Sequence, residues 1–138
     1  MSHKGKIQIT IMFTAGPELV AEGDRIFKSH AAWMARTHHR DGPKAMLLYN
    51  LVKGPERENA MDPSSKPTGN TIFVLTEVYE SQAGMDDHWK QASENWEDFP
   101  AVGPWTSKIK VKTLHGSPVI QVQPPAGSGP PTWTPPIA

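Results

Sequence analysis

The chain has 138 residues, with 14 basic and 14 acidic side chains and a formal net charge of zero at pH 7. This length predicts a single domain with its own core, and the balanced charge argues against a nucleic-acid partner and against binding to a membrane. Cysteine is absent, which excludes disulfides, thiolate metal sites and cysteine nucleophiles. The first residues, MSHKGK, lack an apolar stretch of signal-peptide length, so we expect a cytoplasmic protein.

The first third of the chain predicts a strand, a helix and a second strand. Apolar and polar residues alternate over Ile7–Thr14, which indicates a strand that ends at Gly16-Pro17. From Glu18 to about Thr37 the apolar residues form one helical stripe, and His30 lies at its centre. A short apolar run at Ala45–Val52 is typical of a buried strand.

The middle of the chain carries the residues with the clearest chemistry. Lys53–Asn70 is rich in Pro, Gly, Ser and charge, and predicts a long functional or mobile loop. Thr71–Tyr79 is apolar on both faces apart from its end, which predicts a central strand with Glu77 and Tyr79 on the same face. Gln82 to Trp96 then predicts a second helix, with His88 at the margin of its apolar stripe.

The last third predicts one more strand and a tail. The second helix is expected to end at Phe99-Pro100 and a turn to follow at Gly103-Pro104. A strand is then expected over Ser107–Gln123, with an interruption at Gly116-Ser117-Pro118. The last fifteen residues, Pro124–Ala138, contain six prolines and predict a polyproline-like arm or a loose tail. We therefore expect a domain over residues 1–123 and a C-terminal arm over residues 124–138.

The order of elements, βαββαβ, predicts an α+β protein of the ferredoxin-like type. Its four-stranded antiparallel sheet would carry two helices on one face. Apolar residues on both sides of the first and third strands would leave the other face apolar and exposed. A second copy packed sheet against sheet would cover that face, so we expect a homodimer whose Pro-rich arms reach across the partner subunit.

The segment FVLTEVYESQAGMDDHW, residues 73–89, resembles the third strand and second helix of the antibiotic biosynthesis monooxygenase family, within the dimeric α+β barrel superfamily. The matching positions are Glu77, Tyr79, Glu80, Ala83 and His88. The resemblance implies a dimeric barrel whose ligand sits between helices and sheet. Members include cofactor-free oxygenases of quinol-like polyketides, heme-degrading enzymes, and isomerases or cyclases. The Lys53–Asn70 insertion and the tail depart from the family, as does Tyr79, where Trp is common.

The candidate catalytic residues are His88, His30, Glu77 and Tyr79. We expect His88 or His30 to deprotonate a phenol or enol, and the resulting carbanion to react with oxygen or rearrange without a cofactor. Glu77 would fix the tautomer of His88 and raise its pKa. Each histidine also has a structural interpretation, since His30 could be a hydrogen-bonded core residue and His88 a latch on Glu77.

The candidate ligand-binding residues are aromatic. Trp33 and Trp89 are expected on facing helix stripes, where they could wall a small apolar or aromatic ligand. Tyr49 could orient such a ligand or simply pack. The alternative function is a non-catalytic small-molecule-binding or stress-related dimer.

No metal is predicted. His30, His88 and Glu77 could form a triad of ligands in principle, but the sequence has no helical His-x-x-x-His or Glu-x-x-His pair to anchor an ion. His38 and His39 are expected near a helix C-terminus, where imidazolium interacts favourably with the helix dipole.

Overall fold

The computed structural model describes residues 2–122, so the predicted arm Pro124–Ala138 lies outside the described residues. In chain order the elements are β1 (Ile7–Ala15), a 3₁₀ turn (Pro17–Leu19), α1 (Val20–Thr37), β2 (Met46–Arg57), β3 (Pro67–Tyr79), α2 (Gln82–Asn95), α3 (Phe99–Thr106) and β4 (Lys110–Gly116). The sheet order is β2-β3-β1-β4, and every neighbouring pair is antiparallel. The predicted ferredoxin-like α+β arrangement is confirmed.

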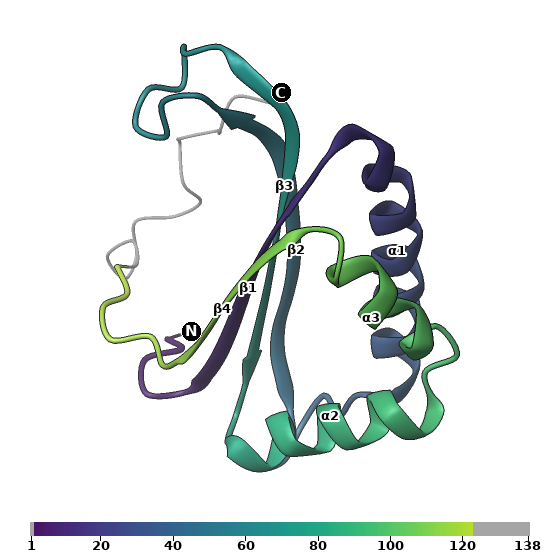
Figure 1. Ribbon diagram of the computed structural model, residues 1–138. Helices are drawn as coiled ribbons and strands as arrows, with labels where there is room; N and C mark the ends of the chain where they lie inside the picture. Colours follow the sequence, from purple (N-terminus) through teal and green to yellow (C-terminus); the bar gives the residue numbers. More distant parts are fainter. Residues whose placement is uncertain (1, 123–138) are drawn as a thin grey trace.

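The three α-helices cover one face of the twisted sheet, and no helix of residues 2–122 lies on the other face, which we call the open face (Figure 1). Because side chains alternate along a strand, each strand divides its residues between these two environments. Phe13 and Phe73 are cross-strand partners on the helix side and are buried. Met12 and Val74 are partners on the open face, where Met12 is 44% exposed.

Aromatic rings fill the core between the sheet and the helices. Neighbouring rings have centroids 5.1 to 5.9 Å apart, and the residues are Phe13, Phe27, Phe73 and Trp105. Trp105, on α3, packs directly over Gly23 of α1, where a Cβ atom would lie 2.5 Å from the indole ring. The indole N–H donates to the carbonyl of Leu19. The third helix therefore closes one end of the core.

Residues 99–106 form this helix, where the sequence predicted a helix end followed by a turn at Gly103-Pro104. The two prolines of this segment, Pro100 and Pro104, favoured the prediction of a loop. Pro100 lies in the first turn of α3, where its missing N–H costs no intrahelical bond, and Pro104 is tolerated in a helix of only two turns. Burial of Trp105, which is 3% exposed, offsets the poor helix propensity.

The predicted long loop over Lys53–Asn70 is also wrong. β2 continues to Arg57 and β3 begins at Pro67, so the connection between the two strands spans residues 58–66. The paired residues include Gly54 with Ile72 and Pro55 with Thr71. Proline is accommodated because β2 is an edge strand and its register shifts between Pro55 and Arg57.

The fourth strand is shorter than predicted. It covers Lys110–Gly116, and residues 117–122 add no further strand. Its end coincides with Gly116-Ser117-Pro118, where the sequence predicted an interruption. Within residues 2–122, no helix is both long and apolar enough to cross a membrane.

Candidate functional site

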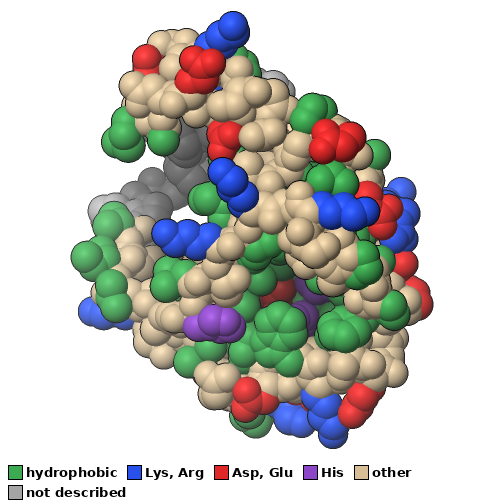
Figure 2. All heavy atoms as spheres, viewed as in Figure 1, with side chains coloured by type: hydrophobic (Ala, Val, Ile, Leu, Met, Phe, Trp, Pro, Cys, Tyr) green, Lys and Arg blue, Asp and Glu red, His purple; other side chains and the backbone are tan. Residues whose placement is uncertain are grey.

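A cavity of about 80 Å³ lies between the helices and the sheet. Figure 2 shows it as a hollow with carboxylate and histidine side chains at its floor. Its lining is almost entirely apolar and aromatic, and the residues are Ile9, Ile11, Phe13, Ile26, Phe27, His30, Leu75, Glu77, His88, Trp89, Ala92, Trp96, Val102 and Trp105. An apolar pocket with a few convergent polar groups is typical of small-molecule sites, although most of those are larger, at about 300–1,000 Å³.

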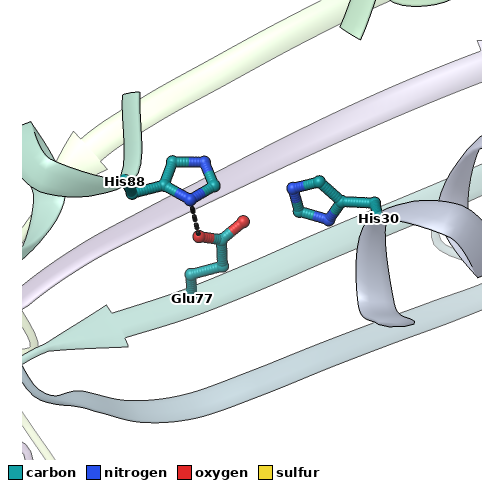
Figure 3. A group of neighbouring side chains, drawn as sticks. All are labelled: His30, Glu77 and His88. Atoms are coloured by element: carbon teal, nitrogen blue, oxygen red, sulfur yellow. Dashed lines mark ion pairs between the residues drawn. The ribbon is translucent and has the colours of Figure 1, made fainter. Parts of the chain in front are cut away.

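The three polar residues of the lining, His30, Glu77 and His88, come from α1, β3 and α2 and point toward one another (Figure 3). All three are buried, and one ligand atom of each lies within 4.8 Å of the others. Glu77 therefore lies on the face of the sheet that the helices cover. We call these three residues the polar cluster.

Glu77 is held by Tyr79, two positions along the same strand. The Tyr79 hydroxyl donates to Oε1 of Glu77 over 2.6 Å, and both side chains are buried. Burial raises the pKa of Glu77 to about 7, although the Tyr79 hydrogen bond opposes this rise. The carboxyl group thus titrates near neutral pH, and burial together with Glu77 raises the pKa of the Tyr79 phenol, which stays protonated.

His30 has a protein partner on one ring nitrogen. Its Nδ1 lies 2.9 Å from the hydroxyl of Tyr49 on β2. Burial, and to a smaller extent His38, lowers the pKa of His30 to about 4, so the ring is neutral at physiological pH. The ring is therefore a hydrogen-bonded core histidine that also lines the cavity.

His88 is paired with a residue that the sequence analysis assigned elsewhere. Its Nδ1 lies 2.9 Å from Nε2 of His38, and 3.7 Å from Oε1 of Glu77. The expected rise in the pKa of His88 is wrong: burial, with His30 and His38 nearby, lowers this pKa to about 3. A neutral imidazole beside Glu77 forms no ion pair at neutral pH, although their separation is within ion-pair range.

His38 is the residue that sequence reasoning missed. It does follow the last residue of α1, and its backbone N–H bonds the carbonyl of Met34. Its ring, however, turns inward to His88, and burial lowers its pKa to about 4, so it is not an imidazolium cap. His39 is instead half-exposed, with Nε2 at 3.8 Å from Asp87. The available sequence signal for His38 was the pair of adjacent histidines at a helix end, of which one can face inward.

The contacts of His38 determine the tautomer of His88. The Thr37 hydroxyl donates to the carbonyl of Trp33 over 2.8 Å, so its oxygen must accept the Nδ1–H of His38 at 2.9 Å. The Nε2 of a neutral His38 is then an acceptor, and it receives the Nδ1–H of His88. Nε2 of His88 therefore carries a lone pair.

Of the aromatic candidates, Trp89 lies at the rim of the cavity, and the others lie behind its lining. Trp89 lines the cavity and is 45% exposed, and it is the one exposed residue of the lining. His88 lies toward the centre of the buried stripe of α2, whereas the sequence placed it at the margin and Trp89 inside. Trp33 is fully buried and stacks on Trp96 at 5.6 Å between centroids, and it does not line the cavity. Tyr49 and Tyr79 contact the polar cluster from outside the lining.

Comparison with known proteins places the fold. No family model matches the sequence, and no curated protein matches it. Among solved structures, the chain is similar to a dimeric ferredoxin-like protein from an uncultured marine organism, with 11% identity over 85% of this chain and 99% of that chain and a TM-score of 0.55. It is also similar to a protein from Deinococcus radiodurans described as "a putative antibiotic biosynthesis monooxygenase", with 19% identity over 86% and 99% of the two chains and a TM-score of 0.50.

Both likenesses confirm the α+β, ferredoxin-like fold class. The second neighbour carries the name of the family that the segment over residues 73–89 resembles, so the resemblance stated from the sequence is matched at the level of fold.

Proposed function

We propose that this protein is a small-molecule enzyme of the monooxygenase-like or isomerase-like kind, acting on a phenolic or enolic compound bound in the cavity. The observation that carries this proposal is the polar cluster at the floor of an otherwise apolar cavity. Apolar walls bind the body of an aromatic ligand, while a few buried polar atoms orient its hydroxyl group. The likeness to a solved structure described as a monooxygenase supports the same class.

His88 is the proposed proton acceptor. Its Nε2 lone pair is available in the neutral ring, because the Nδ1–H is committed to His38. Transfer of a proton from the substrate hydroxyl to Nε2 would leave a phenolate or enolate in the cavity. His30, held by Tyr49, would orient that oxygen, and Glu77, held by Tyr79, would stabilise the imidazolium of His88 at 3.7 Å.

Two outcomes are open to such an anion without a cofactor. In the oxygenase reaction the carbanion form bonds to dioxygen, and the hydroperoxide loses water, so that a CH₂ group and O₂ give a carbonyl group and H₂O. In the isomerase or cyclase reaction the proton returns from His88 to another carbon and no oxidant is consumed. A cavity of about 80 Å³ is small for an aromatic ring, so Trp89 at the rim would have to swing outward on binding.

Self-association is part of the proposal. The open face carries apolar side chains that are 44% to 66% exposed, namely Met12, Val52 and Leu114. Cross-strand pairing places Met12 and Val52 in one row across β1, β3 and β2. One solved neighbour is described as dimeric. A second copy of this chain covering the open face would remove this apolar surface from water.

The test of the enzymatic proposal measures oxygen uptake with hydroquinone, anthrone and enol compounds. Wild-type protein should consume one O₂ per carbonyl formed, or convert the compound without O₂, and His88→Ala should lower the rate by about 10²–10⁴-fold. His39→Ala is the matched control, because this half-exposed neighbour does not line the cavity. Binding without turnover, unchanged by His88→Ala, would favour the alternative of a non-catalytic binding protein.

A further inference from the structure

Each member of the polar cluster has one side-chain atom held by a residue outside the cavity. The three contacts are His30 Nδ1 to the Tyr49 hydroxyl at 2.9 Å, Glu77 Oε1 to the Tyr79 hydroxyl at 2.6 Å, and His88 Nδ1 to His38 Nε2 at 2.9 Å. The remaining atoms are Nε2 of both histidines and Oε2 of the carboxyl group. Within residues 2–122 no hydrogen bond reaches these three atoms. In the same residues every solvent-inaccessible side-chain N or O atom has a hydrogen-bond partner, so the three atoms are not solvent-inaccessible. These three atoms are therefore accessible from the cavity that their residues line.

Two imidazole nitrogens and one carboxylate oxygen form a donor set that suits divalent first-row transition-metal ions. Imidazole suits zinc, iron, copper and nickel, and two histidines with one carboxylate typically leave open coordination positions on Fe(II). We propose that His30, Glu77 and His88 bind one divalent first-row transition-metal ion, with its open positions facing the cavity.

The spacing is close to what such an ion needs. Metal to ligand distances of about 2.0–2.2 Å place neighbouring donor atoms roughly 3–3.5 Å apart. The nitrogen of His88 that faces Glu77 is Nδ1, at 3.7 Å from Oε1 (Figure 3), so the His88 ring would also have to move to bring Nε2 to the ion. One ligand atom of each residue lies within 4.8 Å of the others, so the donor atoms would have to approach by up to about 1.5 Å. Rotation about the side-chain torsions of Glu77 can supply much of this movement without displacing β3.

The outer contacts have the form found around bound metals. A ligating histidine usually donates its second ring N–H to a fixed partner, which sets the tautomer and aims the lone pair at the ion. His88 donates Nδ1–H to His38, and the chain of contacts from Thr37 fixes that direction. Ligating carboxylates are likewise hydrogen-bonded, as Glu77 is by Tyr79. The ligands come from α1, β3 and α2, which explains why no helical pair marks them in the sequence.

Metal binding does not depend on the proposed enzymatic activity. An ion on Nε2 of His88 would occupy the lone pair that the cofactor-free reaction uses, so a metal-loaded protein should lose that reaction. Binding is measured without any substrate, and turnover is measured after chelation. The two proposals can therefore fail separately.

The experiment uses the full, tag-free chain after EDTA treatment and dialysis, titrated with Zn²⁺ by calorimetry and with Co²⁺ by visible absorption. We expect one ion per chain, with Co²⁺ bands of a protein-bound ion. Glu77→Gln and His30→Gln should each weaken binding by about 100-fold, and Tyr79→Phe, which leaves the ligands in place, by about 10-fold. His39→Gln is the matched control and should bind as wild type does.

Binding that is unchanged in both Glu77→Gln and His30→Gln would overturn the site, since the ion would then sit on surface residues. Absence of stoichiometric binding at about 100 μM metal would overturn it as well. Circular dichroism of each metal-free variant confirms folding. Glu77→Gln keeps the shape of the side chain and retains an acceptor for Tyr79, so it carries the test even where a histidine variant does not fold.

Discussion

Nε2 of His38, at the end of α1, lies 2.9 Å from Nδ1 of His88 on α2. This contact joins two helices across 50 positions of sequence and fixes which nitrogen of His88 faces the cavity. Because both rings are neutral, the direction of the hydrogen bond is set at its far end by Thr37 and not by charge.

Replacing His38 by Ala should therefore change the tautomer of His88. Without its acceptor, the buried Nδ1–H costs about 1–3 kcal/mol of stability or moves to Nε2. We expect ¹⁵N NMR of the wild-type protein to show an Nδ1–H tautomer for His88, and His38→Ala to show a mixture or the Nε2–H form. His39→Ala should leave both the spectrum of His88 and the stability within about 0.5 kcal/mol. An Nε2–H tautomer of His88 in the wild-type protein would contradict the series of hydrogen bonds that runs from Thr37 through His38 to His88.

The sequence predicted that Glu77, Tyr79 and His88 lie close together, but it did not predict that His38 joins them. Period-two alternation in β3 was enough to place Glu77 and Tyr79 on one face, and the helical period brought His88 near them. The contact with His38 depends on where the end of α1 meets α2, which is a long-range relation that local periodicity does not contain. The same reason explains the hairpin of β2 and β3, where pairing of Pro55 with Thr71 overrides a loop-like composition.

Stability of the metal-free protein should depend on pH through the buried histidines. His30, His38 and His88 have folded-state pKa values of about 4, 4 and 3, all below the ordinary value of 6.5. The unfolded chain therefore binds more protons, and stability falls as pH drops from about 6.5 toward 4. Urea unfolding at a series of pH values measures this, and a constant free energy of unfolding between pH 7 and 5 would contradict burial of three neutral rings.

Glu77 should act in the opposite direction. Its pKa of about 7 lies above the ordinary 4.5, so the folded state holds its proton more tightly. Its contribution to stability is present below about pH 4.5 and is lost as pH rises through 7. We expect Glu77→Gln to remove this loss, so that the variant gains stability relative to wild type between pH 5 and 8. Equal pH profiles for the two proteins would show that Glu77 ionises freely.

Gly23 should be intolerant of any side chain. A Cβ atom would lie 2.5 Å from the Trp105 ring, which is wedged among Phe13, Phe27 and Phe73 and cannot easily move. Overpacking costs about 1–3 kcal/mol, which outweighs the gain of up to about 1 kcal/mol from alanine in a helix. Gly103→Ala on α3 is the control, because its Cβ would meet nothing within 4 Å. Thermal unfolding should rank Gly23→Ala below wild type and Gly103→Ala at or above it.

The open face of the sheet should mediate self-association. Met12 lies on β1 near the middle of this face, and it pairs with Val74 on one side and Lys112 on the other. An interface of roughly 2,000 Å² would desolvate it, so Met12→Lys should place a charge where water is excluded and weaken the dimer by at least about 100-fold. Met61→Lys is the control, because Met61 lies in the β2–β3 connection and is 91% exposed. Sedimentation at low micromolar concentration should find a dimer for wild type and Met61→Lys and a folded monomer for Met12→Lys. A folded wild-type monomer under these conditions would remove the open face as an interface between copies of this chain.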